Sequence, residues 1–237
     1  MKVFSRTTPN RSERIGTPLY FAMHVTEGAF DGAVSWLCNP AVDGSADEVV
    51  NISGSRVAVL NTIRSGMKSW AVGNGNSVSV SWENEGYSGQ THWPDSHYLT
   101  VAHRLVAAQK AVRSKYGRTI PLRRTTTKGV PGICGHGDLA RWYGGSDHYG
   151  CPGPTFNFNR LVGKCALIQA PADTSRKAQW AWARWYTGLG EYKGHKQAPR
   201  RRPNVPLRIP RTWWPKVVWY QKNVIAARAK AKARRGK

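Results

Sequence analysis

The sequence PLYFAMHVT, residues 18–26, is the stretch that most directly indicates the fold. Its apolar run ends in a polar turn, which is typical of a strand buried in a sheet. His24 follows the apolar residues and so lies near the end of this core strand. The stretch therefore predicts a buried strand that carries a polar, chemically versatile side chain to its end.

Strands and helices alternate through the rest of the first 170 residues. Residues 77–82 alternate in polarity and lead to Glu83, which predicts a strand that delivers an acid at its end. Residues 94–116 show apolar positions at helical spacing, with Gly117 as terminator. The pattern predicts an α/β domain with a mixed central β-sheet flanked by helices. The other expected elements are a polar lead-in over residues 1–16, a helix over 30–37, a hairpin of strands 48–52 and 56–60, a strand over 132–136, a loop over 141–153 and a closing helix over 156–168.

Charge is distributed unevenly along the chain, whose formal net charge is +23. Residues 175–237 hold 18 Lys and Arg against one acid, Glu191, whereas residues 1–174 hold 18 against 12. Six of the eleven tryptophans also lie beyond Ser175. We expect a domain over residues 1–170 and a basic, Trp-rich tail over 171–237 that binds a polyanion, such as a wall polymer, an anionic membrane or nucleic acid.

The N-terminal residues 1–14 are polar and basic, and they lack the apolar core of a secretory signal. No run approaches the roughly 20 apolar residues of a membrane-spanning helix. We therefore expect the chain to be made in the cytoplasm, and something else must release it if it acts outside a membrane. The four cysteines form no C-x-x-C pair and are too few for a fold built on disulfides.

Two histidines and a cysteine stand out as candidate metal ligands. His24 and His136 each lie where an apolar run ends, and Cys151 lies in the sequence Tyr-Gly-Cys-Pro-Gly. Two imidazoles and one thiolate suit Zn²⁺ and leave a fourth coordination position open. The order His, His, Cys does not decide the matter alone, because a chain with seven histidines contains many such triples.

The residues around these candidates resemble the zinc-dependent type 2 N-acetylmuramoyl-L-alanine amidases, a family that includes phage endolysins and shares the fold of peptidoglycan recognition proteins. The resemblance runs from about Pro18 to Leu167, and the Gly-Gly-Ser-Asp-His spacer before Cys151 looks most like lysins of phages that infect actinobacteria. The matching segments are His24-Val25-Thr26-Glu27-Gly28, Trp70 with residues 73–76, residues 79–86 around Glu83, residues 135–138 around His136, and Cys151-Pro152-Gly153.

The resemblance implies a function and roles for these residues. His24, His136 and Cys151 would hold Zn²⁺, and Glu83 would act as general base in hydrolysis of the amide between N-acetylmuramic acid and L-alanine. It also implies that the chain is a phage endolysin, acting at the bacterial cell wall on peptidoglycan. We expect it to act as a monomer.

Some positions depart from the family pattern or leave a choice open. Residues 45–48 lack the aromatic acid/base of some phage amidases, which puts more weight on Glu83, although Glu85 shares its strand face. Relatives place an oxyanion-contacting Lys or Thr two residues before the third ligand, where this chain has Tyr149 beside His148, and either could serve. Cys134 lies two residues before His136 and is expected to pack beneath the site.

Two other functions remain open at this point. A non-catalytic peptidoglycan-binding protein of the same fold can lose the third ligand, whereas this chain keeps Cys151 together with Glu83. A nucleic-acid-binding protein would explain a pI of about 10.5 but leaves the ligand motifs unexplained.

Overall fold

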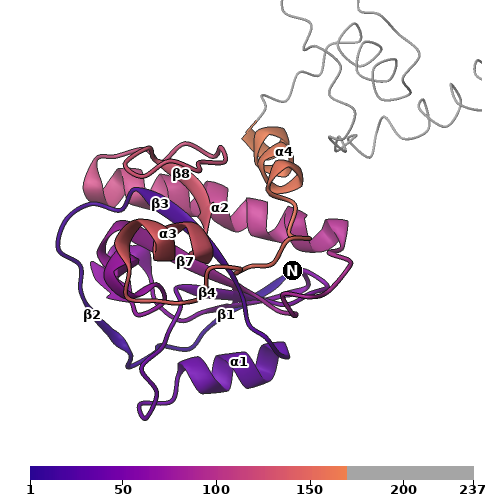
Figure 1. Cartoon of the computed structure of the whole chain (residues 1–237), viewed down its shortest axis with the longest axis horizontal. Helices are drawn as coiled ribbons and strands as arrows, with labels where there is room; N and C mark the ends of the chain where they lie inside the picture. The colour runs from indigo at the N-terminus through magenta and orange to yellow at the C-terminus, as the bar shows by residue number, and fades with distance from the viewer. Residues whose placement is uncertain (170–237) are drawn as a thin grey trace, which may run out of the picture. The chain divides into compact units, whose positions relative to one another are not determined.

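A six-stranded sheet forms the centre of residues 1–169, the part of the chain that this computed structural model describes (Figure 1). Strands β4 and β5 are antiparallel, whereas all other neighbours in this sheet run parallel. The expected mixed sheet is therefore confirmed. The strand order is β1 (Lys2–Ser5), β5 (Arg56–Val59), β4 (Glu48–Val50), β7 (Ser79–Asn84), β3 (Tyr20–Val25) and β8 (Gly132–Gly135), and a separate antiparallel pair joins β2 (Arg11–Glu13) to β6 (Met67–Ser69).

Helices cover both faces of the sheet, because successive strand residues point to opposite sides. Phe21 and Met23 of β3 pack in the main core with residues of α2 and α4. Tyr20 and Ala22 point the other way, into a smaller cluster that includes Leu139 of α3, and α1 covers β4 and β5 through a third cluster. His24 has the same parity as Tyr20 and Ala22, so it faces the α1 and α3 side. The helices are α1 (Phe30–Leu37), α2 (Asp95–Tyr116), α3 (His136–Tyr143) and α4 (Phe158–Gln169), with short 3₁₀ helices at Ile63–Ser65 and Gly73–Val78.

The long helix α2 follows the expected boundaries closely. It begins directly after Pro94, whose backbone is extended, and ends where Gly117 adopts a left-handed φ of 67°. Its core-facing residues, including Val101 and Leu105, are fully buried. The helix thereby encloses the core on the face opposite His24.

The N-terminal lead-in and the start of α3 differ from the sequence expectation. The lead-in expected over residues 1–16 contains strands β1 and β2, because Lys2–Ser5 pair with Arg56–Val59 through backbone groups that need no apolar side chains. Helix α3 begins at His136, where we expected a strand to end, and extends into the expected loop. Its start is stabilised by the Asp138 carboxylate, which accepts the Gly135 N–H at 2.8 Å.

No helix within residues 1–169 is long and apolar enough to cross a membrane. The basic, Trp-rich tail expected over residues 171–237 lies outside the described residues.

Candidate active site and metal centre

Strand pairing brings His24 and Glu83 together. In the parallel pair β3 and β7 the two residues are direct partners, so their side chains lie on the same face. His24 Nδ1 lies 3.7 Å from Glu83 Oε1. His24 is 2% exposed, and its Nε2 atom and Glu83 Oε2 are buried without a hydrogen-bond partner in the protein. Buried polar atoms of native proteins rarely lack partners, so this pair indicates a place prepared for a ligand.

His136 reaches the same place from the neighbouring strand. Strand β8 pairs with β3 up to Gly135, which sits opposite Met23, and His136 is the next residue. The rings of His24 and His136 lie 4.6 Å apart between centroids. His136 Nε2 lies 2.7 Å from Ser146 Oγ, so Ser146 holds the ring from the far side.

Cys151 is brought in by the loop that folds back over the start of α3. Its carbonyl oxygen accepts the Gly137 N–H at 3.1 Å. A Cβ atom on Gly137 would lie 2.1 Å from the carbonyl oxygen of Tyr149, so only glycine allows the loop to lie this close. The glycine after His136 thus decides where the thiol lies.

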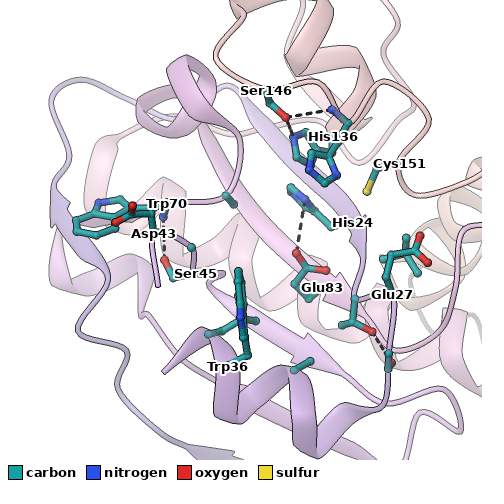
Figure 2. Close-up of a pocket in the computed structure, with 18 of the residues that line it drawn as sticks. His24, Glu27, Trp36, Asp43, Ser45, Trp70, Glu83, His136, Ser146 and Cys151 are labelled. Atoms are coloured by element: carbon teal, nitrogen blue, oxygen red, sulfur yellow. Dashed lines mark hydrogen bonds and ion pairs between the residues drawn. The ribbon is translucent and has the colours of Figure 1, made fainter. Parts of the chain in front are cut away.

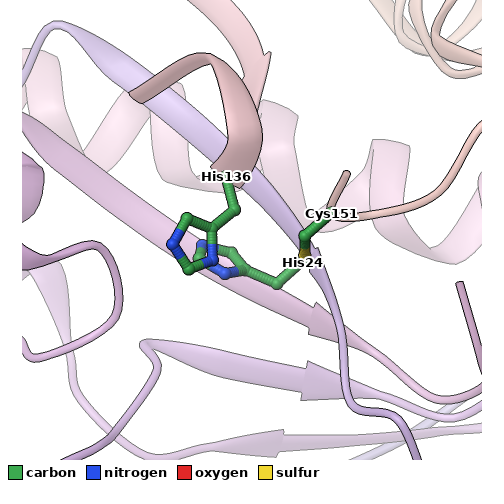
Figure 3. Close-up of side chains that lie close together, drawn as sticks. All are labelled: His24, His136 and Cys151. Atoms are coloured by element: carbon green, nitrogen blue, oxygen red, sulfur yellow. The ribbon is translucent and has the colours of Figure 1, made fainter. Parts of the chain in front are cut away.

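The three side chains form one cluster (Figure 3). One ligand atom from each of His24, His136 and Cys151 lies within 4.8 Å of the others. Two nitrogen donors and one sulfur donor, with an unpartnered His24 nitrogen among them, fit a zinc ion. Cys134 is not in this cluster and lies fully buried beside Tyr20, as expected.

Burial disfavours every charged form in this cluster. Burial, with His136 and His148 adding to it, lowers the pKa of His24 well below its usual value. Burial and His148 likewise lower the pKa of His136 to about 4. The two imidazoles are therefore neutral at pH 7, which is the form that binds a metal.

The acidic groups shift in the opposite direction for the same reason. Burial, followed by the nearby charge of Glu27, raises the pKa of Glu83 to about 8. Burial, followed by the charge of Glu83, raises the pKa of the Cys151 thiol to about 12. A cation placed among these groups would stabilise the Glu83 carboxylate and the Cys151 thiolate. It would thereby lower both pKa values and oppose the effect of burial.

The cluster lies in the wall of a cavity of about 660 Å³ (Figure 2). Helix α1 and the residue before it contribute one side, where Ala29, Gly32 and Ala33 carry a methyl group or no side chain and the larger Trp36 follows. Trp70 and Asp43 line the far part. This volume accommodates an extended peptide or a sugar, since small-molecule sites occupy roughly 300–1,000 Å³.

Glu83 on β7 and Glu85, directly after this strand, have different surroundings. Glu83 lines the cavity, whereas Glu85 accepts the backbone N–H of Phe30 at 2.8 Å and that of Ile52 at 2.6 Å. Glu85 therefore connects the start of α1 to the turn that follows β4.

His148 and Tyr149 also differ in position. His148 lines the cavity and stacks on His136, with ring centroids 5.2 Å apart. Tyr149 is 52% exposed, does not line the cavity, and has its ring near the Arg141 guanidinium.

Sequence reasoning missed two residues of the site, Ser146 and Glu27. Ser146 lies in the glycine-rich spacer before Cys151, where a hydroxyl among glycines was the available signal. Glu27 lies within the first matched segment, but its left-handed φ of 48° is not something that a sequence reveals for a non-glycine residue.

Comparison with known proteins gives one sequence match and several structural ones. A sequence model of the N-acetylmuramoyl-L-alanine amidase family matches residues 15–154, whereas no curated protein sequence matches the chain. Among solved structures, the Staphylococcus aureus hydrolase AmiA in complex with its ligand is similar, with a TM-score of 0.52 and 16% identity over 71% of this chain and 85% of that chain. The Ph2119 endolysin from a Thermus scotoductus MAT2119 bacteriophage has a TM-score of 0.42 and 18% identity over 69% of this chain and 99% of that chain.

The likeness to AmiA supports the fold, and the family match supports the function. That match covers more than half of the chain and includes every segment that forms the cavity cluster. The chain therefore belongs to the N-acetylmuramoyl-L-alanine amidase family and is a peptidoglycan amidase.

Proposed function

We propose that this amidase depends on zinc held by His24, His136 and Cys151, and that it acts as a phage endolysin at the bacterial cell wall. The observation that supports zinc is the convergence of three ligand atoms within 4.8 Å beside a buried carboxyl group with an unpartnered oxygen. Bound zinc would supply Lewis-acid chemistry to the scissile amide carbonyl and to water.

Glu83 is proposed to move the proton. Its carboxylate takes a proton from the attacking water and returns it to the nitrogen of L-alanine, as the new C–O bond forms and the C–N bond breaks. The products are the lactyl carboxylate of the muramic acid and the protonated amine of the peptide, which also takes up the second proton of the water. Glu85 is already occupied by two backbone N–H groups, which favours Glu83 for this role.

His148 is proposed to assist at the carbonyl oxygen. It lines the cavity beside the ligand cluster, so its ring N–H can donate to the oxygen as negative charge develops. Tyr149, the other sequence candidate, would have to leave its position near Arg141 to do the same.

Digestion of purified peptidoglycan tests the reaction. Zinc-loaded protein should release stem peptides that begin with L-alanine and leave glycan strands intact, as read by mass spectrometry. New reducing sugar ends would instead reveal a glycosidase, and binding without release would reveal a receptor. Chelation should abolish the activity, and added zinc should restore it.

The tail is proposed to deliver the enzyme to the wall without taking part in the chemistry. Residues 175–237 hold 18 Lys and Arg, and such a cluster attracts anionic wall polymers or a membrane surface through screened, long-range forces. A chain that ends near Ala170 should keep turnover on soluble muropeptides while its adsorption to whole walls drops and loses most of its salt dependence. Loss of turnover in a folded, truncated protein would place the tail in the active site. Salt-dependent binding of DNA by the tail would support the nucleic-acid alternative as a side activity.

A further inference from the structure

The cavity differs in charge from the rest of the protein. Residues 1–169 hold 18 Lys and Arg against 11 Asp and Glu, so the average surface is basic. The described residues that line the cavity nevertheless include three acids, Glu27, Asp43 and Glu83, and no Lys or Arg. None of the described Lys and Arg side chains of this basic protein therefore lines the cavity.

The acids are spread along the cavity. Figure 2 shows Glu27 at one end near Cys151 and Asp43 at the other end near Trp70, with Glu83 between them. Glu27 is held in place, because its Oε1 accepts the Ser88 N–H at 2.9 Å. Glu27 lies two residues after the end of β3, has a left-handed φ of 48° and lines the cavity.

A zinc ion bound in the cluster would not make the net charge of the cavity lining positive. The thiolate of Cys151 and the carboxylate of Glu83 together balance the two charges of zinc, so Glu27 and Asp43 remain uncompensated. The cavity is also a built site independently of these acids, because His24 is 2% exposed and its Nε2 lacks a protein partner there. Substrate groups that lie near Glu27 or Asp43, two exposed acids of the cavity lining, therefore meet negative charge.

Peptidoglycan stem peptides carry side carboxyl groups, such as that of the glutamyl residue after L-alanine, which are free in some walls and amidated in others. A free carboxylate would meet like charges in the cavity, with no described cation to pair with. We propose, on the basis of the function above, that Glu27 and Asp43 make this amidase select stem peptides whose glutamyl carboxyl group is amidated.

A matched pair of substrates tests the proposal. Two soluble N-acetylmuramoyl tetrapeptides, identical except for a free or amidated glutamyl carboxyl group, are digested by the zinc-loaded, full-length protein. We expect kcat/KM to be about tenfold higher for the amidated substrate, equivalent to about 1.4 kcal/mol. Equal values, or a preference for the free carboxylate, would overturn the proposal and leave the amidase function intact.

Variants of the acids assign the effect to residues. Glu27→Gln keeps the acceptor for Ser88 N–H and removes only the charge, so the preference for the amidated substrate should fall to about threefold. The double variant that also carries Asp43→Asn should show a smaller preference still. Glu13→Gln changes net charge equally, but Glu13 lies on β2 and does not line the cavity, so the preference should remain. A preference that survives in the Glu27 and Asp43 double variant would refute their role.

Binding provides a second readout that does not require turnover. Calorimetry of the metal-free protein with the same two muropeptides should show tighter binding of the amidated one. If neither substrate is cleaved, the proposed function fails, and this binding comparison alone decides whether the cavity selects against carboxylates.

Discussion

Two regions of the central sheet each bury a carboxyl group, and their surroundings differ. Asp47, beside β4, is 1% exposed and accepts three hydrogen bonds: from Asn61 Nδ2 at 2.9 Å, Ser69 Oγ at 2.8 Å and Ser81 N at 2.8 Å. Burial raises the pKa of Asp47, and the charge of Arg14 and these three donors oppose the shift. Both oxygens of this carboxyl group accept hydrogen bonds, and these bonds connect β7 and β6 to the loops beside them.

Glu83, at the cavity, shows the opposite condition. One of its oxygens has no hydrogen-bond partner, and the other lies 3.7 Å from His24 Nδ1. Burial raises the pKa of Glu83 to about 8, and no hydrogen-bond donor opposes the shift. The comparison teaches that in this protein a buried acid with a full set of donors supports the fold, whereas one without them is available for chemistry.

The largest effect should come from removing a proposed metal ligand. Apparent zinc-binding free energies are on the order of 10 kcal/mol, so loss of one of three ligands should weaken affinity by about two to three orders of magnitude. Cys151→Ser should therefore lose both zinc and lysis, measured by metal analysis and by turbidity of suspended cell walls. Cys38→Ser is the control, since Cys38 is half-buried outside the cluster. Full zinc and activity in the Cys151 variant would exclude this ligand set.

Glu83→Gln tests the reactive half of the comparison. The change is nearly isosteric and removes the base, so kcat should fall by about two to four decades while zinc content and melting temperature are retained. Glu85→Gln should instead cost stability, because one amide oxygen cannot replace two carboxylate oxygens that accept Phe30 and Ile52 N–H groups. If Glu85→Gln abolishes turnover and Glu83→Gln does not, the roles are exchanged.

Asp47→Asn tests the structural half. An amide NH₂ would face at least one of the present donors, and an unsatisfied buried group costs about 1–3 kcal/mol. Urea unfolding should show that loss, whereas kcat per folded molecule should stay near the normal value. A drop in kcat without a stability change would mean that Asp47 acts on the site.

The smallest effect is expected at an acid that has partners but is not buried. Asp95 pairs with Lys164 at 3.1 Å and with Arg160, joining α2 to α4, and its side chain is 46% exposed. Burial opposes its ionisation, but the hydrogen bonds and charges of Lys164 and Arg160 outweigh burial and lower its pKa below 3.8. Asp95→Asn should cost less than about 1 kcal/mol at pH 7 because solvent screens the pair.

The pH dependence of that small effect has a definite sign. A lowered pKa in the folded state stabilises the protein above the unfolded value of 3.8, and the contribution is lost as pH falls through the lowered pKa. The stability difference between wild type and Asp95→Asn should therefore shrink below pH 3.8 in urea titrations. A difference that grows on acidification would contradict this assignment.

The sequence by itself determined the elements whose side chains follow a period and the motifs at their ends. Apolar spacing predicted α1, α2 and α4 close to their observed bounds, and the run before His24 predicted β3, because burial of one helix face or strand imposes these patterns locally. The motif segments also named the three residues that meet in the cluster. Strand β1 and helix α3 escaped prediction, because β1 is held by backbone pairing with β5 and α3 by contacts at its first turn.

Tertiary structure alone decided which candidates share a site. Glu83 and Glu85 have the same parity in the sequence, and only the position of α1 shows that Glu85 is occupied at Phe30 N. The lack of Lys and Arg among the described cavity-lining residues depends on segments far apart in the chain, since the lining runs from His24 to Cys151. The contact of Ser146 with His136 joins residues ten apart, but it forms only because the intervening loop folds back on α3. Local sequence specifies the conformation of each segment, but the partners of a polar atom are set by which segments the packed core brings together.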